Sequence, residues 1–330
     1  MTRAVAAWNR FWFQPQPTST LALVRIAVGL VATGWTASQL PTLLTFYGPN
    51  GVMPALPDEA PGIWGLLTVG APSAVVVGAW VVTLLSAIAL TVGLHTRLAA
   101  ILLFLGILSF ERRDPMVVNA GDVLLRVVVL YLALAPAGAA LSLDRYRAHR
   151  DRFWEFPARA PWALRLIQIQ LSVLYLGTVW SKINGETWRS GTAVSFALQI
   201  EDIHRAPVPG FITSSPTIVE LLTFGTLAVE LSIALFVWNR TLRPWVLGAG
   251  ITLHLGIALF IMVGFFSLTI LAVYLAFVPP ETAARLVGTV RDRTWPHREA
   301  EADAGPEPVA EPVAEPVVEP VVEPVLDRRP

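Results

Sequence analysis

Long apolar runs separated by short charged blocks dominate the chain. A helix that crosses a bilayer needs about 20 mostly apolar residues. About eight runs approach that length, at residues 20–40, 74–94, 98–110, 121–141, 162–182, 217–237, 243–263 and 265–278. They predict an all-α, polytopic transmembrane helical bundle of about eight helices. Six or seven crossings are the alternative, because the third run is short and only Gly264 interrupts the last two.

Composition narrows the classes of function. Charged residues make up 15% of the 330 residues, against about 25% in an ordinary soluble domain, which excludes a water-soluble enzyme and a disordered chain. The formal net charge is zero, so nucleic-acid binding through a basic field is not expected. The chain has no cysteine, which excludes disulfides and cysteine-ligated metals. No other metal-binding motif is evident, and we predict no metal site.

Basic residues predict the orientation of the bundle. With the N-terminus inside and eight crossings, most arginines in the connections fall on the inner side, chiefly in residues 145–159 and 285–298. Because inner loops of membrane proteins are rich in arginine and lysine, both termini are expected to be cytoplasmic. The sequence therefore predicts a multi-pass protein of the cell membrane, with the lipid bilayer as its main partner.

Three segments are expected along the chain. Residues 1–18 form an interfacial N-terminal segment, because Trp8, Phe11 and Trp12 share one helical face. Residues 19–280 form the transmembrane domain. Residues 281–330 form a disordered cytoplasmic tail, with five Glu-Pro-Val repeats from residue 307 onward.

An outer layer of polar residues is predicted at the ends of the third, fourth and fifth runs. Lys182 stands out in it as the one lysine among 24 basic residues. A desolvated lysine can lose its proton and act as a base, whereas arginine stays protonated; the alternative is a lysine that only snorkels to the interface. Asp122 and Arg126 are four residues apart and can pair on one helix face. The layer comprises Glu111, Arg112, Arg113, Asp114, Asn119, Asp122, Arg126 and Lys182.

A deep layer contains Gln170, Glu230 and His254. At a rise of about 1.5 Å per residue, they lie about 12, 10 and 16 Å from the inner ends of their helices. We expect them to face one another, either as a proton relay or as a hydrogen-bonded packing contact. Lys182 lies about 30 Å from the inner end of its helix, so Glu230 is not expected to be its direct partner.

Several motifs, in this order, resemble a known family. They include NRFWF at residues 9–13, FYGPNGVMP at 46–54, NAGD at 119–122, KINGETWRSGTAV at 182–194 and HLG at 254–256. Over residues 5–280 the chain resembles the HTTM (horizontally transferred transmembrane) domain family, the membrane domain shared by vitamin K-dependent γ-carboxylase and many bacterial proteins.

The resemblance implies quinol chemistry at the outer membrane face. The γ-carboxylase lysine that matches Lys182 is thought to deprotonate vitamin K hydroquinone, so a reduced quinone (vitamin K or menaquinone hydroquinone) is the implied cofactor. Lys182 and Asp122 would then be catalytic. Substrate would be held by Asn119, Arg126, Arg113, Trp188 and Tyr47.

Two other functions remain as alternatives. One is a non-catalytic membrane factor that helps to mature or export a secreted peptide, which would be its partner. The other is a proton-coupled transporter that uses Glu230 and His254 as a relay.

Overall fold

The computed structural model describes residues 2–53, 66–67 and 70–294. The Glu-Pro-Val repeats and Pro54, the end of the first-loop motif, lie outside these residues. Contacts divide the chain into two units, Met1–Arg285 and Leu286–Pro330. The site and the cavity described below lie in the first unit.

Apart from loops, the described chain is almost entirely helical. Strand β1 (Gln16–Pro17) pairs antiparallel with β2 (Ala158–Arg159), and an isolated antiparallel bridge joins His204 and Ile261. Every predicted apolar run contains a helix, which confirms the all-α class. These helices are α2 (Ser19–Ser38), α4 (Ser73–Val92), α5 (Thr96–Arg113), α6 (Ala120–Leu134), α8 (Trp162–Ile183), α12 (Pro216–Phe236), α13 (Arg243–Phe260) and α14 (Phe266–Tyr274) with η5 (Leu275–Phe277).

Shorter elements connect these helices. Helix α1 (Arg3–Phe13) precedes α2, and η1 (Leu40–Thr42) and α3 (Leu43–Tyr47) follow it. Helix η2 (Pro115–Val117) lies between α5 and α6. Between α6 and α8 lie α7 (Leu143–Ala148) and η3 (Arg150–Arg152). Between α8 and α12 lie α9 (Glu186–Arg189), α10 (Ala193–Ala197), η4 (Glu201–Ile203) and α11 (Gly210–Thr213).

Five helices of the described chain are long and apolar enough to cross a membrane: α4, α8, α12, α13 and α2 with its continuation to Tyr47. A sixth is added if the bent pair formed by α14–η5 and α15 (Pro280–Thr294) counts as one span. Helix α5 carries Glu111, Arg112 and Arg113 in its last turns. The eight-crossing count and the orientation therefore stay predictions, while a multi-pass membrane protein is supported.

Two helix ends differ from the sequence-based expectation. Helix α6 stops at Leu134, short of residue 141, because Ala135 precedes Pro136 and adopts an extended conformation. The prediction of a disordered tail from residue 281 is wrong for its first part, which forms α15 through Thr294. Glu281 in the first turn and Arg291 and Arg293 in the last complement the helix dipole.

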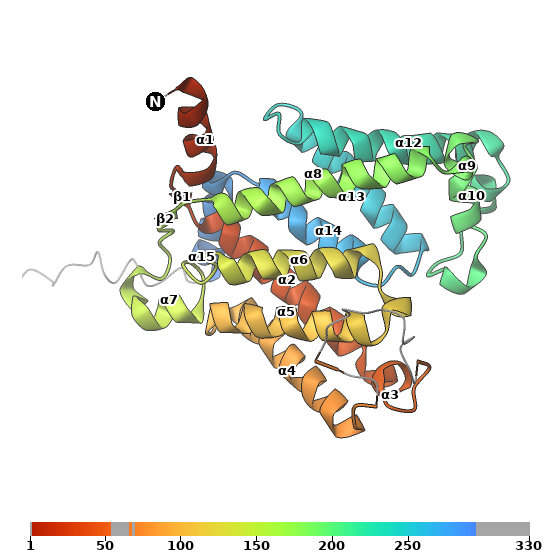
Figure 1. Cartoon of the computed structure of the whole chain (residues 1–330). Helices are drawn as coiled ribbons and strands as arrows, with labels where there is room; N and C mark the ends of the chain where they lie inside the picture. Colours follow the sequence, from red (N-terminus) through yellow and green to blue (C-terminus); the bar gives the residue numbers. More distant parts are fainter. Residues whose placement is uncertain (1, 54–65, 68–69, 295–330) are drawn as a thin grey trace, which may run out of the picture. The chain divides into compact units, whose positions relative to one another are not determined.

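The helices pack in two groups, which α14 and the direct contact between α6 and α8 join. Helix α2 packs on α4, α4 on α5 and α5 on α6, whereas α8 packs on α12 and α12 on α13 (Figure 1). Small residues allow close approach: a Cβ on Gly106 of α5 would lie 2.1 Å from the Thr83 hydroxyl oxygen of α4. Helix α14 contacts α2, α6 and α13.

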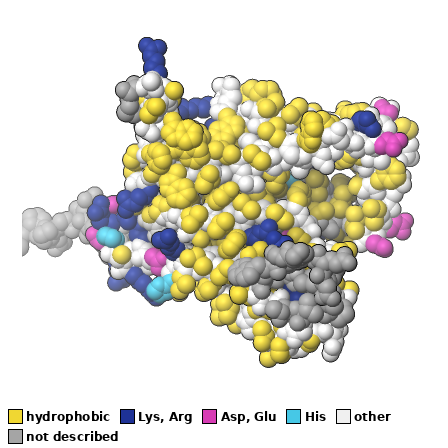
Figure 2. Space-filling model, viewed as in Figure 1, with side chains coloured by type: hydrophobic (Ala, Val, Ile, Leu, Met, Phe, Trp, Pro, Cys, Tyr) yellow, Lys and Arg dark blue, Asp and Glu magenta, His cyan; other side chains and the backbone are white. Residues whose placement is uncertain are grey.

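Hydrophobic side chains cover most of the face over α8 and α12, whereas charged side chains gather near α7 and near α9 and α10 (Figure 2). Trp180 is 68% exposed, Leu221 71% and Trp245 77%. Such a broad apolar surface is suited to lipid rather than water. On α1, Trp8 packs on Trp12 with ring centroids 5.5 Å apart. The interfacial role of residues 1–18 stays a prediction.

Candidate functional site

An ion pair joins two helices that are candidate membrane spans. The Lys182 ammonium, in the last turn of α8, pairs with the Glu230 carboxylate on α12. The side chains are 21% and 10% exposed, respectively. The Thr178 hydroxyl donates to the other Glu230 oxygen at 3.3 Å. A carboxylate in apolar surroundings is costly unless it is paired and hydrogen-bonded, and both conditions hold here.

The chain folds back after α8 to place an aromatic ring on the lysine. Helix α8 ends at Ile183, and the Gly185 N–H donates to the Lys182 carbonyl at 2.9 Å in the turn that follows. Helix α9 then places the Trp188 ring beside the amine, with Nζ 4.8 Å from the ring centroid. Lys182 therefore contacts a carboxylate and an indole face together.

The prediction that Glu230 cannot contact Lys182 is wrong, because the inner ends of α8 and α12 are not level. Trp238, just beyond α12, donates from Nε1 to Ser172 Oγ at 2.9 Å, and Ser172 lies about 15 Å along α8 from its start. Helix α12 runs antiparallel to α8, so Glu230, eight residues before Trp238, lies about 12 Å further toward the end of α8. These distances place Glu230 at nearly the same height as Lys182.

A buried hydrogen-bonded group lies next to this pair. The Tyr175 hydroxyl is 2.8 Å from His254 Nε2 and 2.5 Å from the Tyr274 hydroxyl. Thr178 connects the group to the pair, because its single hydroxyl proton is shared between the Tyr175 carbonyl at 3.0 Å and the Glu230 carboxylate at 3.3 Å. Sequence analysis missed both tyrosines, although Tyr175 precedes Lys182 by seven residues and thus shares its helix face.

The predicted deep layer is therefore not one cluster. The Gln170 amide oxygen accepts from the Tyr131 hydroxyl of α6 at 3.3 Å, away from the other two. His254 bonds to Tyr175 rather than to Glu230. Only Glu230 and His254 come near each other, through the Tyr175–Thr178 segment of α8.

A second polar group, the α5–α6 cluster, contains Tyr47, Glu111, Arg113, Asn119, Asp122 and Arg126. Arg113 is fully buried and donates to the carbonyls of Gly48 at 2.8 Å and Met53 at 2.6 Å, which ties down the loop after α3. Tyr47 packs against Phe110 with ring centroids 4.9 Å apart.

Asp122 does not pair with Arg126, contrary to the expectation from their spacing. Arg126 pairs with Glu111 on α5. Asp122 accepts from the Asn119 N–H at 2.9 Å, while the Asn119 side chain accepts from the Gly121 N–H at 2.8 Å. This reciprocal cap satisfies free N–H groups at the start of α6, and it uses the carboxylate for local structure.

The predicted site residues thus form two groups rather than one. Among the described residues, no hydrogen bond or ion pair links Lys182 to the α5–α6 cluster. The start of α14 lies between the groups. The Phe266 ring is 5.4 Å from that of His254, and a Cβ on Gly121 would lie 2.5 Å from the Phe266 Cα.

A family model for the HTTM domain matches residues 13–281. The chain belongs to the HTTM-domain family. This membership confirms the resemblance seen in the sequence and agrees with the apolar helices of a multi-pass membrane protein. No curated protein and no solved structure gives a significant match to the chain.

In this HTTM-domain protein, the Lys182–Glu230 pair is the arrangement best suited to proton transfer. Its two members are titratable side chains in direct contact, and the lysine is partly exposed. In the α5–α6 cluster, Arg113 and Asp122 bond to the backbone, and Glu111 pairs with Arg126, whose guanidinium stays protonated. The geometry therefore favours Lys182, Glu230 and Trp188 as the group that contacts a substrate.

Proposed function

We propose that this HTTM-domain protein is a quinol-dependent, carboxylase-like membrane enzyme that removes a proton from a reduced lipid quinone at the outer end of α8. The observation that carries the proposal is the ion pair between Lys182, the one lysine of the chain, and a largely buried Glu230. A paired acid and base inside a membrane is costly to maintain, which makes a functional role the default hypothesis.

The residues present fit a quinol. A quinol offers two hydroxyl groups and a planar ring, and the site offers an amine, a carboxylate and the indole face of Trp188. Lys182 is 21% exposed, and it lies on a helix that is a candidate membrane span. A membrane-soluble substrate can therefore approach the amine from the bilayer.

The pair can move a proton without changing the net charge of the site. Glu230 takes a proton from the Lys182 ammonium, and the neutral amine then accepts one from a hydroxyl of the bound substrate. The carboxylate ends protonated, and the restored ammonium lies beside the negative substrate oxygen. Because charge is expensive to create at low dielectric, exchanging one anion for another beside the same cation lowers the barrier. The family resemblance alone suggests the other reactants, which are dioxygen as the oxidant and a secreted peptide as the acceptor of the carboxyl group.

Quinol turnover tests the proposal. Full-length protein in lipid nanodiscs receives menaquinone or vitamin K hydroquinone with dioxygen and bicarbonate, and mass spectrometry measures the epoxide. We expect epoxide from the wild type and about 10²- to 10⁴-fold less from Lys182→Ala, since a general base contributes rate factors of that order. Arg189→Ala removes an exposed positive charge from α9 and is the matched control, which should retain activity.

Absence of epoxide with folded wild-type protein would overturn the proposal and favour the peptide-maturation alternative. The transporter alternative makes a different prediction. It requires flux that depends on a pH gradient, that is lost in Glu230→Gln and that persists in Lys182→Ala. Loss of quinol turnover in both variants, without such flux, would support the enzyme.

A further inference from the structure

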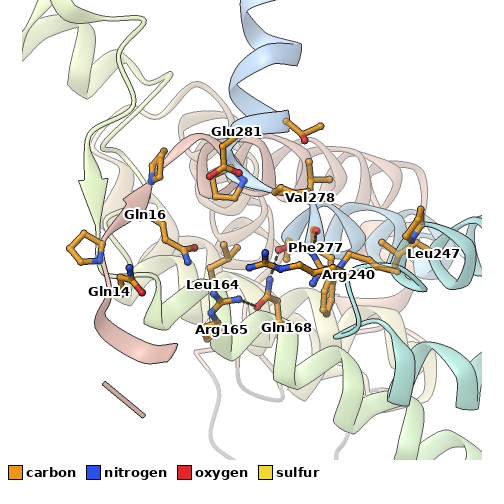
Figure 3. Close-up of a pocket in the computed structure, with 18 residues that line it drawn as sticks. Gln14, Gln16, Leu164, Arg165, Gln168, Arg240, Leu247, Phe277, Val278 and Glu281 are labelled. Carbon is orange, nitrogen blue, oxygen red and sulfur yellow. Dashed lines mark hydrogen bonds between the residues drawn. The ribbon is translucent and has the colours of Figure 1, made fainter. Parts of the chain in front are cut away.

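A cavity of about 940 Å³ lies at the end of the bundle where α8 and α13 begin, opposite the Lys182 end of α8. Its walls come from the segment after α1, the first turns of α8 and α13, and the junction between η5 and α15 (Figure 3). The proposed quinol site uses none of these residues. A cavity of this size is in the range of ligand-binding pockets.

The charged side chains that line the cavity are Arg165, Arg240, Arg243 and Glu281. Arg165 and Gln168 lie on one wall, with Glu281 across the cavity from them (Figure 3). No salt bridge joins any of the three arginines to an acidic group of the described chain. Three positive charges and one negative charge leave the cavity with a net positive potential.

The arginines have only neutral partners, which leaves donor groups free. Arg165 donates from Nη1 to the Gln168 side chain at 2.8 Å, and its guanidinium lies 4.9 Å from the centre of the Phe11 ring. Arg243 donates to the carbonyls of Val237 at 2.8 Å and Phe277 at 3.2 Å. Each guanidinium has five N–H donors, so these contacts fix the two arginines in place without exhausting their hydrogen-bonding capacity.

Holding three guanidinium groups around one space costs electrostatic energy. Arg240 and Arg243 both act on Arg165 as like charges. An anion in the cavity would turn this repulsion into attraction. Arginine is also the side chain whose planar fork best matches the oxygens of a phosphate group.

The level of the cavity indicates where such an anion comes from. Helix α8 has 22 residues, which corresponds to about 33 Å, close to the roughly 30 Å hydrocarbon core of a bilayer. Arg165 is the fourth residue of α8 and Arg243 the first of α13. Both therefore lie at the boundary of the hydrocarbon, where lipid phosphates are found.

We propose that this cavity binds a phosphate-bearing anionic head group. Arg165 and Arg243, which their neutral contacts hold in place, form the fixed walls. Arg240 is exposed and its side chain forms no hydrogen bond with the residues that the structure describes, so it is free to close on the bound anion. Glu281 selects against fully ionised, multiply charged ligands by like-charge repulsion.

Lipid binding to full-length, delipidated protein in detergent tests the proposal by native mass spectrometry. The probes are phosphatidylglycerol, which is anionic, and phosphatidylcholine, which is zwitterionic. We expect preferential binding of phosphatidylglycerol and about fivefold weaker binding by Arg240→Gln, from about 1 kcal/mol per basic residue near an anionic lipid. Arg97→Gln, which removes an exposed arginine from the first turn of α5 away from the cavity, should bind like wild type.

Competition with glycerol 3-phosphate identifies the source of the phosphate. No displacement of phosphatidylglycerol at millimolar concentration supports a lipid ligand, and displacement supports a soluble phosphate ester in the same site. Equal binding of the two lipids would overturn the proposal. So would equal losses in Arg240→Gln and Arg97→Gln, because that result would show general surface electrostatics rather than a site.

Discussion

The α5–α6 cluster and the Lys182–Glu230 pair lie at the same end of the bundle (Figure 1) and use similar residue types, but their partners differ. Arg113 donates to two backbone carbonyls, and Asp122 accepts from a backbone N–H. Lys182 and Glu230 bond to each other. A charged group that bonds to the backbone cannot change its protonation state without loosening a loop or a helix end, and Arg126, which pairs with Glu111 in the first region, does not lose its proton. The Lys182–Glu230 pair can transfer a proton without the loss of a backbone hydrogen bond. The comparison therefore assigns structure to the first region and chemistry to the second.

The largest effect is expected for Lys182→Arg, which distinguishes a role of the positive charge of Lys182 from a role in proton transfer. Arginine at this position keeps the positive charge and can still pair with Glu230, but it does not lose its proton. We expect Lys182→Arg to lower quinol turnover about 10²- to 10⁴-fold with little change in thermal unfolding. Wild-type turnover in Lys182→Arg would show that only the charge matters and would end the distinction between the two regions.

Removal of the buried guanidinium of Arg113 should mainly lower the free energy of unfolding. Arg113→Met leaves the Gly48 and Met53 carbonyls without their donor. Each unsatisfied buried polar group costs about 1–3 kcal/mol, so we expect a loss of about 3 kcal/mol in the free energy of unfolding. Denaturation in detergent measures it, and Arg112→Met, at an exposed neighbour, is the control. Unchanged stability with lost turnover would move Arg113 into the reactive site.

Loss of the cap on α6 should have a smaller effect. Asn119→Ala removes the side chain that accepts from the Gly121 N–H, and loss of such a cap costs about 1 kcal/mol. We expect quinol turnover per folded molecule to stay near wild type. A large drop in turnover at unchanged stability would instead support the substrate-binding role that the sequence suggested for Asn119 and Asp122.

The smallest effect is expected on the pH dependence of stability, from Asp144. This carboxylate lies outside the candidate membrane spans and accepts hydrogen bonds from the backbone N–H groups of His95 and Thr96. Burial alone would raise the pKa of Asp144, but hydrogen bonds from Thr96 and from the His95 N–H outweigh it and lower that pKa. The stabilisation is thus present above the ordinary carboxyl pKa of about 4 and is lost as the pH falls through the lower value of the folded state. We expect wild type to exceed Asp144→Asn in melting temperature by a constant amount between about pH 5 and 7, and the difference to shrink below about pH 4. A constant difference at all pH values would contradict a charge effect.

The sequence predicts the helices well because apolar runs of membrane length have few alternatives. It also singles out Lys182, since the chain has no other lysine. It does not predict the offset of α12 along α8, which depends on contacts such as Trp238 with Ser172. For the same reason it misses the partner of Lys182 and the tyrosines around His254. The sequence also does not predict the basic cavity, because the segments that carry Arg165 and the Arg240–Arg243 pair are distant in the chain and meet only in the fold.

Because the chain has a single lysine, contact between a quinol and the Lys182 amine can be tested directly. Full-length protein labelled with ¹³Cε-lysine should give one lysine side-chain signal in nanodiscs. We expect this signal to shift, and the shift to saturate, as reduced menaquinone is added. A signal that stays fixed while the same sample consumes the quinol would place the reaction elsewhere and contradict the account.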